Sequence, residues 1–308
     1  MHIQSFTHRA CGIDWYCQQQ GDGPAVVLVP SGEGDCTPFE PVAARLADQF
    51  SVLTFDMPGF SRTSAPADPQ DLTPVKAADQ VAALVRSLGI DNATFYGCSS
   101  GGIVVLGLIA VHPDVVTNGI VHEVAINADY RSGKSESLLP SLCALTDDEI
   151  VGQCKMIFRE LMNDDPVAWD ALGQEYHARL KRNYVTWVRR YVNYSGPGPG
   201  YEPADFTNRP LDWTIGGFTP AMTFFSNVQL AASLGIPLGL LPCKHFPQVS
   251  IPDLLADHIR RSASHHPSLI TMHPPTSAST RRQANRGNRR SALSRSTPRR
   301  EARAIPKP

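Results

Sequence analysis

The residues Gly97-Cys98-Ser99-Ser100-Gly101 fit the pattern G-x-S-x-G. A β-type run over 93–96 comes directly before them, and an apolar helical run over 103–111 follows. This setting is typical of a strand-to-helix elbow, which holds a serine in a strained turn with its hydroxyl exposed. The N-terminus of the following helix favours negative charge developing nearby. We therefore predict that Ser99 is a nucleophile, although the pattern alone also fits an ordinary Gly/Ser-rich turn.

A serine hydroxyl becomes a good nucleophile only when a base takes its proton. His245 follows the last buried-type strand (237–241) and precedes the last helix, so it belongs to the same sheet edge as Ser99. The other nine histidines lie in the chain ends or inside helices, except His122, which is expected to face away from Glu123. We predict His245 as the base; the alternative is a surface loop histidine.

The base needs a carboxylate to hold its tautomer and stabilise its cation. The commoner place for it, after the strand at 211–217, carries no acid, and Asp212 lies at the wrong end of that strand. The strand at 118–122 is the first strand after the elbow helix, and Glu123 directly follows it. This position lies at the correct edge of the sheet. We predict Glu123 as the acid; the alternative is an ordinary strand-end glutamate.

The negatively charged intermediate of acyl transfer needs two N–H donors. In this arrangement one comes from the residue after the nucleophile, Ser100, and the other from the loop after the strand at 25–29. We assign the second donor to Gly32 in that loop.

The elements that must position these residues alternate along the chain. Buried-type strands are predicted at 13–18, 25–29, 51–55, 93–96, 118–122, 211–217 and 237–241, and helices at 39–50, 73–88, 103–111, 220–234 and 252–262. Such alternation indicates an α/β protein with a mostly parallel, doubly wound sheet. Ligands bind such sheets beyond the carboxyl ends of the strands, where the predicted loops converge.

The alternation stops between about 130 and 208. This segment is polar-helical over 145–162 and 166–194, and nine of the chain's 24 aromatic residues lie within 158–206. We predict a helical cap over 130–208, an α/β core formed by 1–129 and 209–264, and a disordered basic tail over 265–308, which is rich in Ser, Thr, Pro and Arg. The cap aromatics either pack it onto the core or form an apolar pocket for a bulky ligand.

Charge and cysteine content narrow the function classes. Residues 1–280 carry 18 basic and 28 acidic side chains, which argues against nucleic acid as a partner. Seven scattered cysteines without zinc-type spacing indicate a reducing compartment and no metal site. No signal peptide and no apolar run long enough for a membrane span is evident. We expect a cytoplasmic protein that needs no cofactor and contacts no membrane. The sequence is compatible with a homodimer but does not decide the oligomeric state.

With the elbow, Glu123 and His245 in place, the chain resembles the zearalenone hydrolases, α/β-hydrolases that open a macrocyclic lactone. The similarity covers about residues 11–260. It is carried by the segments Gly12-Ile13-Asp14-Trp15-Tyr16, Val26-Val27-Leu28-Val29-Pro30, Thr54-Phe55-Asp56-Met57-Pro58-Gly59, Gly97-Cys98-Ser99-Ser100-Gly101, His122-Glu123, Pro210-Leu211-Asp212-Trp213-Thr214 and His245-Phe246-Pro247.

The resemblance implies an α/β-hydrolase fold whose catalytic serine, glutamate and histidine match the three residues chosen above. It also implies that a cap tryptophan matching Trp187 contacts the lactone and that Tyr191 and Phe224 line the pocket. Ser31 stands where the family usually has Asp, and Gly102-Ile103 differs from its relatives. Both departures lie at the pocket rim, where they bear on which lactone is preferred.

The sequence thus predicts a serine hydrolase that opens the ester of a macrocyclic resorcylic acid lactone, so that its partner is a small-molecule substrate, a large aromatic lactone. Two alternatives stay open: a general carboxylesterase for smaller esters, and a ligand sensor that keeps the triad but turns over slowly.

Overall fold

The computed structural model describes residues 3–68, 74–125, 142–192, 202–207 and 209–264. The predicted tail, 265–308, lies outside the described residues, as do parts of the predicted cap. Met1–Pro267 forms one compact unit, and all of the described residues belong to it.

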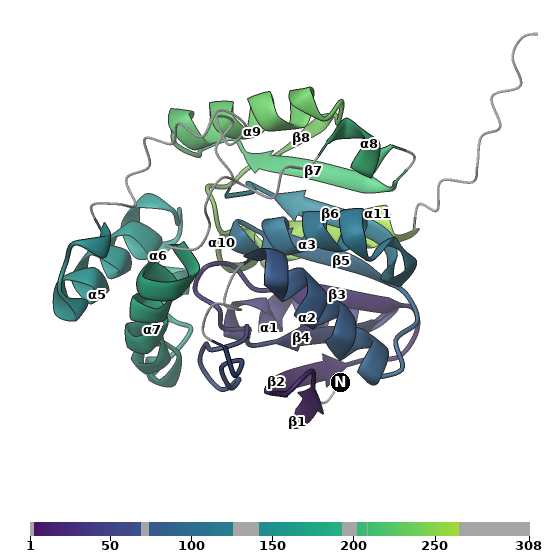
Figure 1. The fold of residues 1–308 in the computed structure, drawn as a ribbon. Coiled ribbons are helices and arrows are strands. Elements are labelled where there is room, and N and C mark those ends of the chain that lie inside the picture. Colours follow the sequence, from purple (N-terminus) through teal and green to yellow (C-terminus); the bar gives the residue numbers. More distant parts are fainter. Residues whose placement is uncertain (1–2, 69–73, 126–141, 193–201, 208, 265–308) are drawn as a thin grey trace, which may run out of the picture. The chain divides into compact units, whose positions relative to one another are not determined.

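Eight strands form one sheet in the order β1-β2-β4-β3-β5-β6-β7-β8 (Figure 1). They are β1 (Gln4–Ala10), β2 (Ile13–Gln20), β3 (Ala25–Val29), β4 (Ser51–Phe55), β5 (Ala93–Cys98), β6 (Val116–His122), β7 (Leu211–Gly216) and β8 (Leu238–Leu241). The pairs from β4 to β8 are all parallel, and β1 and β2 join antiparallel at one edge. The mostly parallel α/β sheet predicted from the alternation is confirmed.

Helices cover both faces of the sheet. Along β3, Val27 and Val29 join one apolar core, and Val26 and Leu28 join another. The first core includes residues of α2 (Pro74–Ser87), α3 (Ser100–Val111) and α9 (Ala221–Ser233), and the second includes residues of α1 (Glu40–Leu46) and α11 (Pro252–Ser264). Burial on both faces explains why these strands read as continuous apolar runs. Short helical turns are η1 (Thr37–Phe39), η3 (Pro113–Val115) and α10 (Pro247–Ser250).

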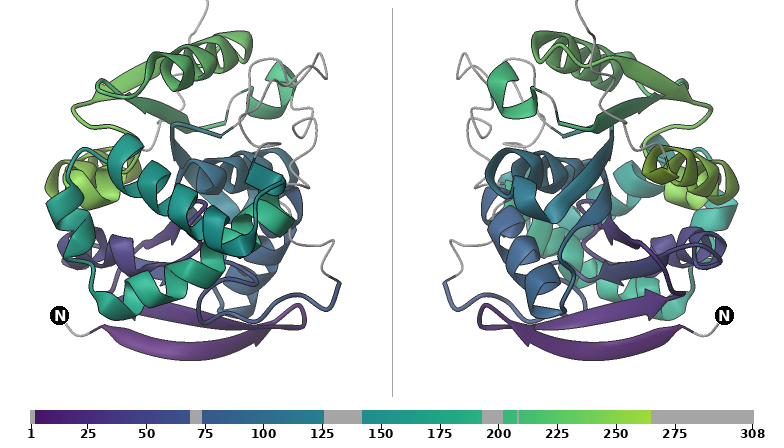
Figure 2. Two further views of the ribbon diagram at one scale, coloured as in Figure 1. Left: turned by 90° about the vertical axis from the view of Figure 1, so that its left-hand side faces the viewer. Right: turned by 90° about the vertical axis from the view of Figure 1, so that its right-hand side faces the viewer.

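A group of helices lies beyond the carboxyl ends of the parallel strands (Figure 2, left). It consists of α5 (Asp147–Met156), η5 (Ile157–Leu161), α6 (Pro166–Asp170), α7 (Gln174–Thr186) and η6 (Trp187–Val192). The short helix α8 (Pro203–Phe206) lies instead beside the start of β7, at the opposite edge of the sheet (Figure 1). Thr146 starts α5 with a capping box that includes Glu149. Phe158 and Tyr184 from these helices belong to the same apolar core as Val26 and Leu28, so the helices are packed onto the sheet.

One strand, β1, was not predicted from the sequence. It is an edge strand whose side chains are mostly exposed, so it lacks the apolar signal of a buried strand. Its turn into β2 places Cys11 and Gly12 at positive φ, as tight hairpins require. In the described part of the chain, the helices are too short or too polar to cross a bilayer.

Candidate active site

Ser99 occupies the elbow between β5 and α3. Its φ of 57° and ψ of −120° form a strained conformation for a residue with a Cβ, and α3 begins at the next residue. A Cβ at Gly97 would lie 2.3 Å from the Gly101 carbonyl oxygen, and one at Gly101 would lie 2.6 Å from the Pro30 carbonyl oxygen. The two glycines of the motif are therefore required by close backbone approach. Ser99 itself is 9% exposed, so this residue is largely covered.

His245 and Glu123 meet at this same edge. The distance from His245 Nδ1 to Glu123 Oε2 is 2.6 Å, and both side chains are buried. Because Nδ1 is engaged by the carboxylate, Nε2 is the ring nitrogen left to exchange a proton. Nε2 is buried and makes no hydrogen bond within the described part of the chain, Ser99 included. Catalytic hydrogen bonds of this kind often close only when substrate binds.

The Glu123 carboxylate is held by donors that sequence reasoning missed. The Gly216 amide donates to Oε1 at 2.7 Å, and the Thr219 hydroxyl donates to Oε2 at 3.0 Å. Burial by itself raises the pKa of this carboxyl, but the hydrogen bond and positive charge of His245 and the other donors outweigh it and lower the pKa. A carboxylate was sought after β7, but the last residue of β7 and the loop that follows it instead supply donors to Glu123.

His122 lies closer to Glu123 than the sequence predicted. Its Nε2 is 3.9 Å from Glu123 Oε1, although alternation along a strand had suggested opposite directions. The reason is that Glu123 lies past the end of β6 with a positive φ of 44°, which turns its side chain back. The His122 ring bonds Thr214 Oγ1 at 3.0 Å and the Lys244 carbonyl at 3.3 Å, and burial lowers its pKa to about 4. His122 is thus a neutral, fully bonded core residue.

The predicted oxyanion loop lies directly against the first residue of η6. A Cβ added to Gly32 would meet Trp187 Nε1 at 2.7 Å, so the indole packs on the Gly32 backbone. The Trp187 ring contacts Phe158 edge to face at 5.2 Å, and Phe158 stacks on Phe246, the neighbour of His245, at 5.7 Å. An aromatic row therefore connects the oxyanion loop to the segment that carries the histidine.

The remaining predicted site residues have different environments. Ser31 and Ser100 are buried next to Gly32 and Ser99 respectively. Phe224 lies half-buried near the start of α9, edge to face with Phe225 at 5.6 Å. The side chain of Tyr191 lies outside the described residues.

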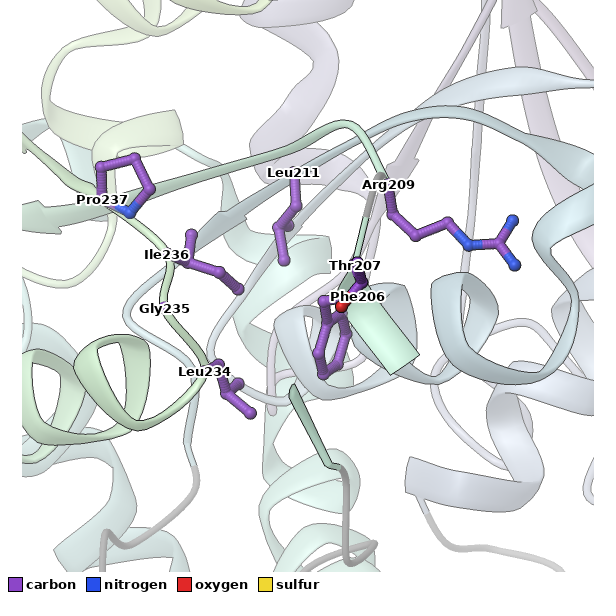
Figure 3. Close-up of a pocket in the computed structure, with 8 residues that line it drawn as sticks. All are labelled: Phe206, Thr207, Arg209, Leu211, Leu234, Gly235, Ile236 and Pro237. Carbon is purple, nitrogen blue, oxygen red and sulfur yellow. The ribbon is translucent and has the colours of Figure 1, made fainter. Parts of the chain in front are cut away.

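A cavity of about 300 Å³ lies elsewhere, between α8 and the segment that joins α9 to β8 (Figure 3). Its lining includes Leu211 and Pro237, at the amino ends of β7 and β8. Ser99 follows the carboxyl end of β5, which runs parallel to these strands through β6, so this cavity is on the opposite edge from the triad.

Comparisons with known proteins agree with this geometry. Residues 24–141 match a family described as the alpha/beta hydrolase fold. A zearalenone hydrolase of Bionectria ochroleuca is 40% identical over 274 residues, which cover 86% of this chain and 100% of that protein. A zearalenone hydrolase of Cladophialophora bantiana is 39% identical over 80% of this chain and 92% of its own length.

Solved structures with low identity share the fold alone. The enol-lactonase of Burkholderia xenovorans LB400 superposes with a TM-score of 0.65 at 18% identity, covering 84% of this chain and 100% of its own. The epoxide hydrolase VrEH1 of Vigna radiata gives 0.61 at 14% identity, covering 84% and 97%. Since these two enzymes are named for different chemistry, the fold does not select the reaction.

Proposed function

Because the chain belongs to the zearalenone hydrolase family of α/β-hydrolases, we propose that it opens the ester bond of a macrocyclic resorcylic acid lactone such as zearalenone, with Ser99 as nucleophile. The observation that carries the proposal is the 2.6 Å bond between His245 and Glu123, in a chain similar to zearalenone hydrolases along their length. Ester or lactone hydrolysis is the chemistry of the family.

The proposed reaction has two halves. His245 Nε2 takes the Ser99 proton while Oγ attacks the lactone carbonyl, and the resulting oxyanion accepts hydrogen bonds from the N–H groups of Gly32 and Ser100. Collapse of this intermediate breaks the ring C–O bond, and the leaving alkoxide takes the proton from His245. The opened ring stays attached to Ser99 as an ester, and water activated by His245 then releases a hydroxy acid. Throughout, Glu123 stabilises the imidazolium.

In this proposal the helices over 142–192 act as a cap that receives the aromatic part of the substrate. Support comes from the position of Trp187 against Gly32, which puts a large ring beside the proposed oxyanion donor. Ser31, Tyr191 and Phe224 complete the proposed binding surface. Resorcylic rings stack well on aromatic side chains.

The acidic balance of residues 1–280 supports a small-molecule substrate rather than nucleic acid. A cytoplasmic location and a homodimer also belong to the proposal. The scattered spacing of the seven cysteines supports the cytoplasmic location.

The decisive experiment is incubation of purified protein with zearalenone, with ring opening followed as the mass gain of one water. We expect multiple turnovers, and we expect Ser99→Ala to lower kcat by at least ~1000-fold. Hydrolysis of p-nitrophenyl butyrate far faster than zearalenone would favour the general esterase, and a single slow turnover would favour the sensor. Unchanged ring opening by Ser99→Ala would reject the mechanism.

A further inference from the structure

Glu33 follows the proposed oxyanion residue Gly32, and its side chain is buried although it has no part in the triad. Its carboxylate enters the aromatic helices above the sheet. The Tyr176 hydroxyl in α7 donates to Oε2 at 2.7 Å, and Trp169 Nε1 in α6 donates to Oε1 at 3.4 Å. The Asn183 side-chain amide, also in α7, donates to the Glu33 backbone carbonyl at 2.8 Å. Three hydrogen bonds thus tie this one residue to the two helices.

Neighbouring contacts reinforce the same connection. Arg179 in α7 donates to Asp35 at 2.7 Å, and Asn183 bonds both the amide and the hydroxyl of Ser61. Tyr176, Arg179 and Asn183 are spaced three and four residues apart, so they lie on one face of α7. This face is built to hold the loop over 32–36.

The loop and the helix that these bonds join each lead directly to a residue of the proposed active site. Gly32, which precedes Glu33, carries the proposed oxyanion N–H, and Trp187 directly follows the last residue of α7. Trp187 packs on Gly32 so closely that a Cβ there would lie 2.7 Å from the indole nitrogen. A shift of the loop relative to α7 would therefore change the oxyanion donor and the aromatic ring together.

We propose that Glu33 is a positioning residue: by fastening the oxyanion loop to α6 and α7, it fixes the Gly32 amide in the geometry that the tetrahedral intermediate requires. The inference rests on the proposed function. A buried carboxylate lowers the stability of the fold unless it is well hydrogen-bonded. If the side chain served packing alone, a leucine-sized apolar side chain would stabilise the fold more. Glu33 instead acts through the direction of its bonds.

The protonation state of Glu33 distinguishes a positioning role from packing alone, because only a positioning role would make kcat depend on whether this carboxyl is ionised. The pKa of Glu33 is raised to about 7, chiefly by burial; the bonds from Tyr176 and Trp169 lower the pKa, and the charge of Asp35 raises it. The other titratable groups that act on it are Tyr184 of α7 and Cys98 of β5, whose own pKa values lie above their ordinary ones because of burial. Ionised Glu33 accepts both bonds, whereas protonated Glu33 must give up one acceptor position.

The experiment compares Glu33→Ala, Glu33→Gln and Tyr176→Phe, with Glu175→Gln as control because Glu175 is exposed on α7. Ring opening of zearalenone and hydrolysis of p-nitrophenyl butyrate are measured for each, with active centres counted by covalent labelling of Ser99. We expect Glu33→Ala to lower kcat about tenfold to hundredfold on both substrates, because both need the same oxyanion donor. KM for the small ester should stay near the wild-type value.

Glu33→Gln keeps an acceptor for the indole and a polar partner for Tyr176, so it should restore kcat to within about threefold at pH 8. The ratio of wild-type to Glu33→Gln kcat should change between pH 6 and pH 8. If Glu33→Ala does not fold, Tyr176→Phe with Glu33→Gln decides the question. Wild-type kcat in Tyr176→Phe together with a ratio independent of pH would overturn the proposal.

Ser99→Ala separates the two hypotheses. If it abolishes ring opening while Glu33→Ala leaves kcat per active centre unchanged, the positioning role is rejected and the proposed function stands. If ring opening survives in Ser99→Ala, the proposed function fails and the inference fails with it.

Discussion

At the scale of single residues, burial and hydrogen bonding give neighbouring groups different charges. Glu123 is surrounded by donors and stays ionised, whereas His122, 3.9 Å away, is neutral because burial lowers its pKa. Cys98 directly precedes Ser99, but burial raises its thiol pKa well above the ordinary value, and its Sγ donates to the His245 carbonyl at 2.9 Å. Cys98 is therefore a packing residue, and it does not compete with the neighbouring Ser99 hydroxyl for the proposed role of nucleophile.

Glu123→Gln tests the role of the carboxylate charge. A neutral amide cannot stabilise the imidazolium that forms on His245, so we expect kcat to fall by about 10³- to 10⁴-fold with little change in fold. Asp212→Asn is the matched control, because Asp212 bonds Ser262 and His258 away from the triad. Steady-state kinetics and circular dichroism check the result; equal effects of the two substitutions would contradict the assignment.

Glu33→Gln also tests linkage between pH and stability. The folded pKa of Glu33 is raised from 4.5 to about 7, so between these values the native state holds the proton more tightly than the unfolded chain. The contribution of this residue to the free energy of unfolding should therefore fall as pH rises from about 4.5 to about 7, by about 3 kcal/mol in total. The difference in stability between wild type and variant, measured by urea unfolding at pH 5 and pH 8, isolates it from other groups.

At the scale of elements, strand ends and loops decide where the functional atoms lie. The elbow joins β5 to α3, the loop after β3 carries Gly32, and the ends of β6 and β8 lead into Glu123 and His245. The last residue of β7 contributes a backbone donor, and the loop after β7 contributes a hydroxyl donor. Five neighbouring strand ends thus supply one site, as expected at the carboxyl edge of a parallel sheet.

Gly216→Ala tests the end of β7. A Cβ there would lie 2.4 Å from the Cys243 carbonyl oxygen and 2.9 Å from Glu123 Oε1, so the strand end must move. We expect a loss of about 2 kcal/mol in the free energy of unfolding and a lower kcat, because the Gly216 amide would leave Glu123. Gly152→Ala in α5 is the control: apart from the adjoining backbone of its own helix, no atom of the described residues lies within 4 Å of the added Cβ, and the helix should gain about 0.5–1 kcal/mol. Both values come from urea unfolding.

At the scale of the whole compact unit, the helices over 142–192 share an apolar core with one face of the sheet. Phe158 links Trp187 to Phe246, so the proposed cap is packed against the loop that carries His245. Substrate size, rather than reactivity, is the property that this arrangement can select.

Trp187→Ala tests that selection. Loss of the indole removes contact area for a large lactone but not for a small ester, so KM for zearalenone should rise at least about tenfold while p-nitrophenyl acetate hydrolysis changes little. Michaelis constants for the two substrates give the answer. Equal losses on both would mean that Trp187 serves only to pack on Gly32.

Much of the site could be predicted from the sequence because local rules govern it. Gly97 and Gly101 are demanded by backbone approach at the elbow, and the chain order of Ser99, Glu123 and His245 follows the order of strands that end at one edge. Buried strands are recognisable by their apolar runs, whereas β1, an exposed edge strand, carries no such signal and was missed.

Only the tertiary structure could decide which side chains meet when they are far apart in the sequence. The Gly216 amide and the Thr219 hydroxyl hold Glu123 from more than ninety residues away. The bond between Glu33 and Tyr176 spans 143 residues, and neither residue type in its local context predicts the other. Sequence patterns determine which elements form and which edge they share, because backbone geometry repeats along the chain. Packing of particular side chains across that edge depends on how the helices dock, and only the folded structure decides it.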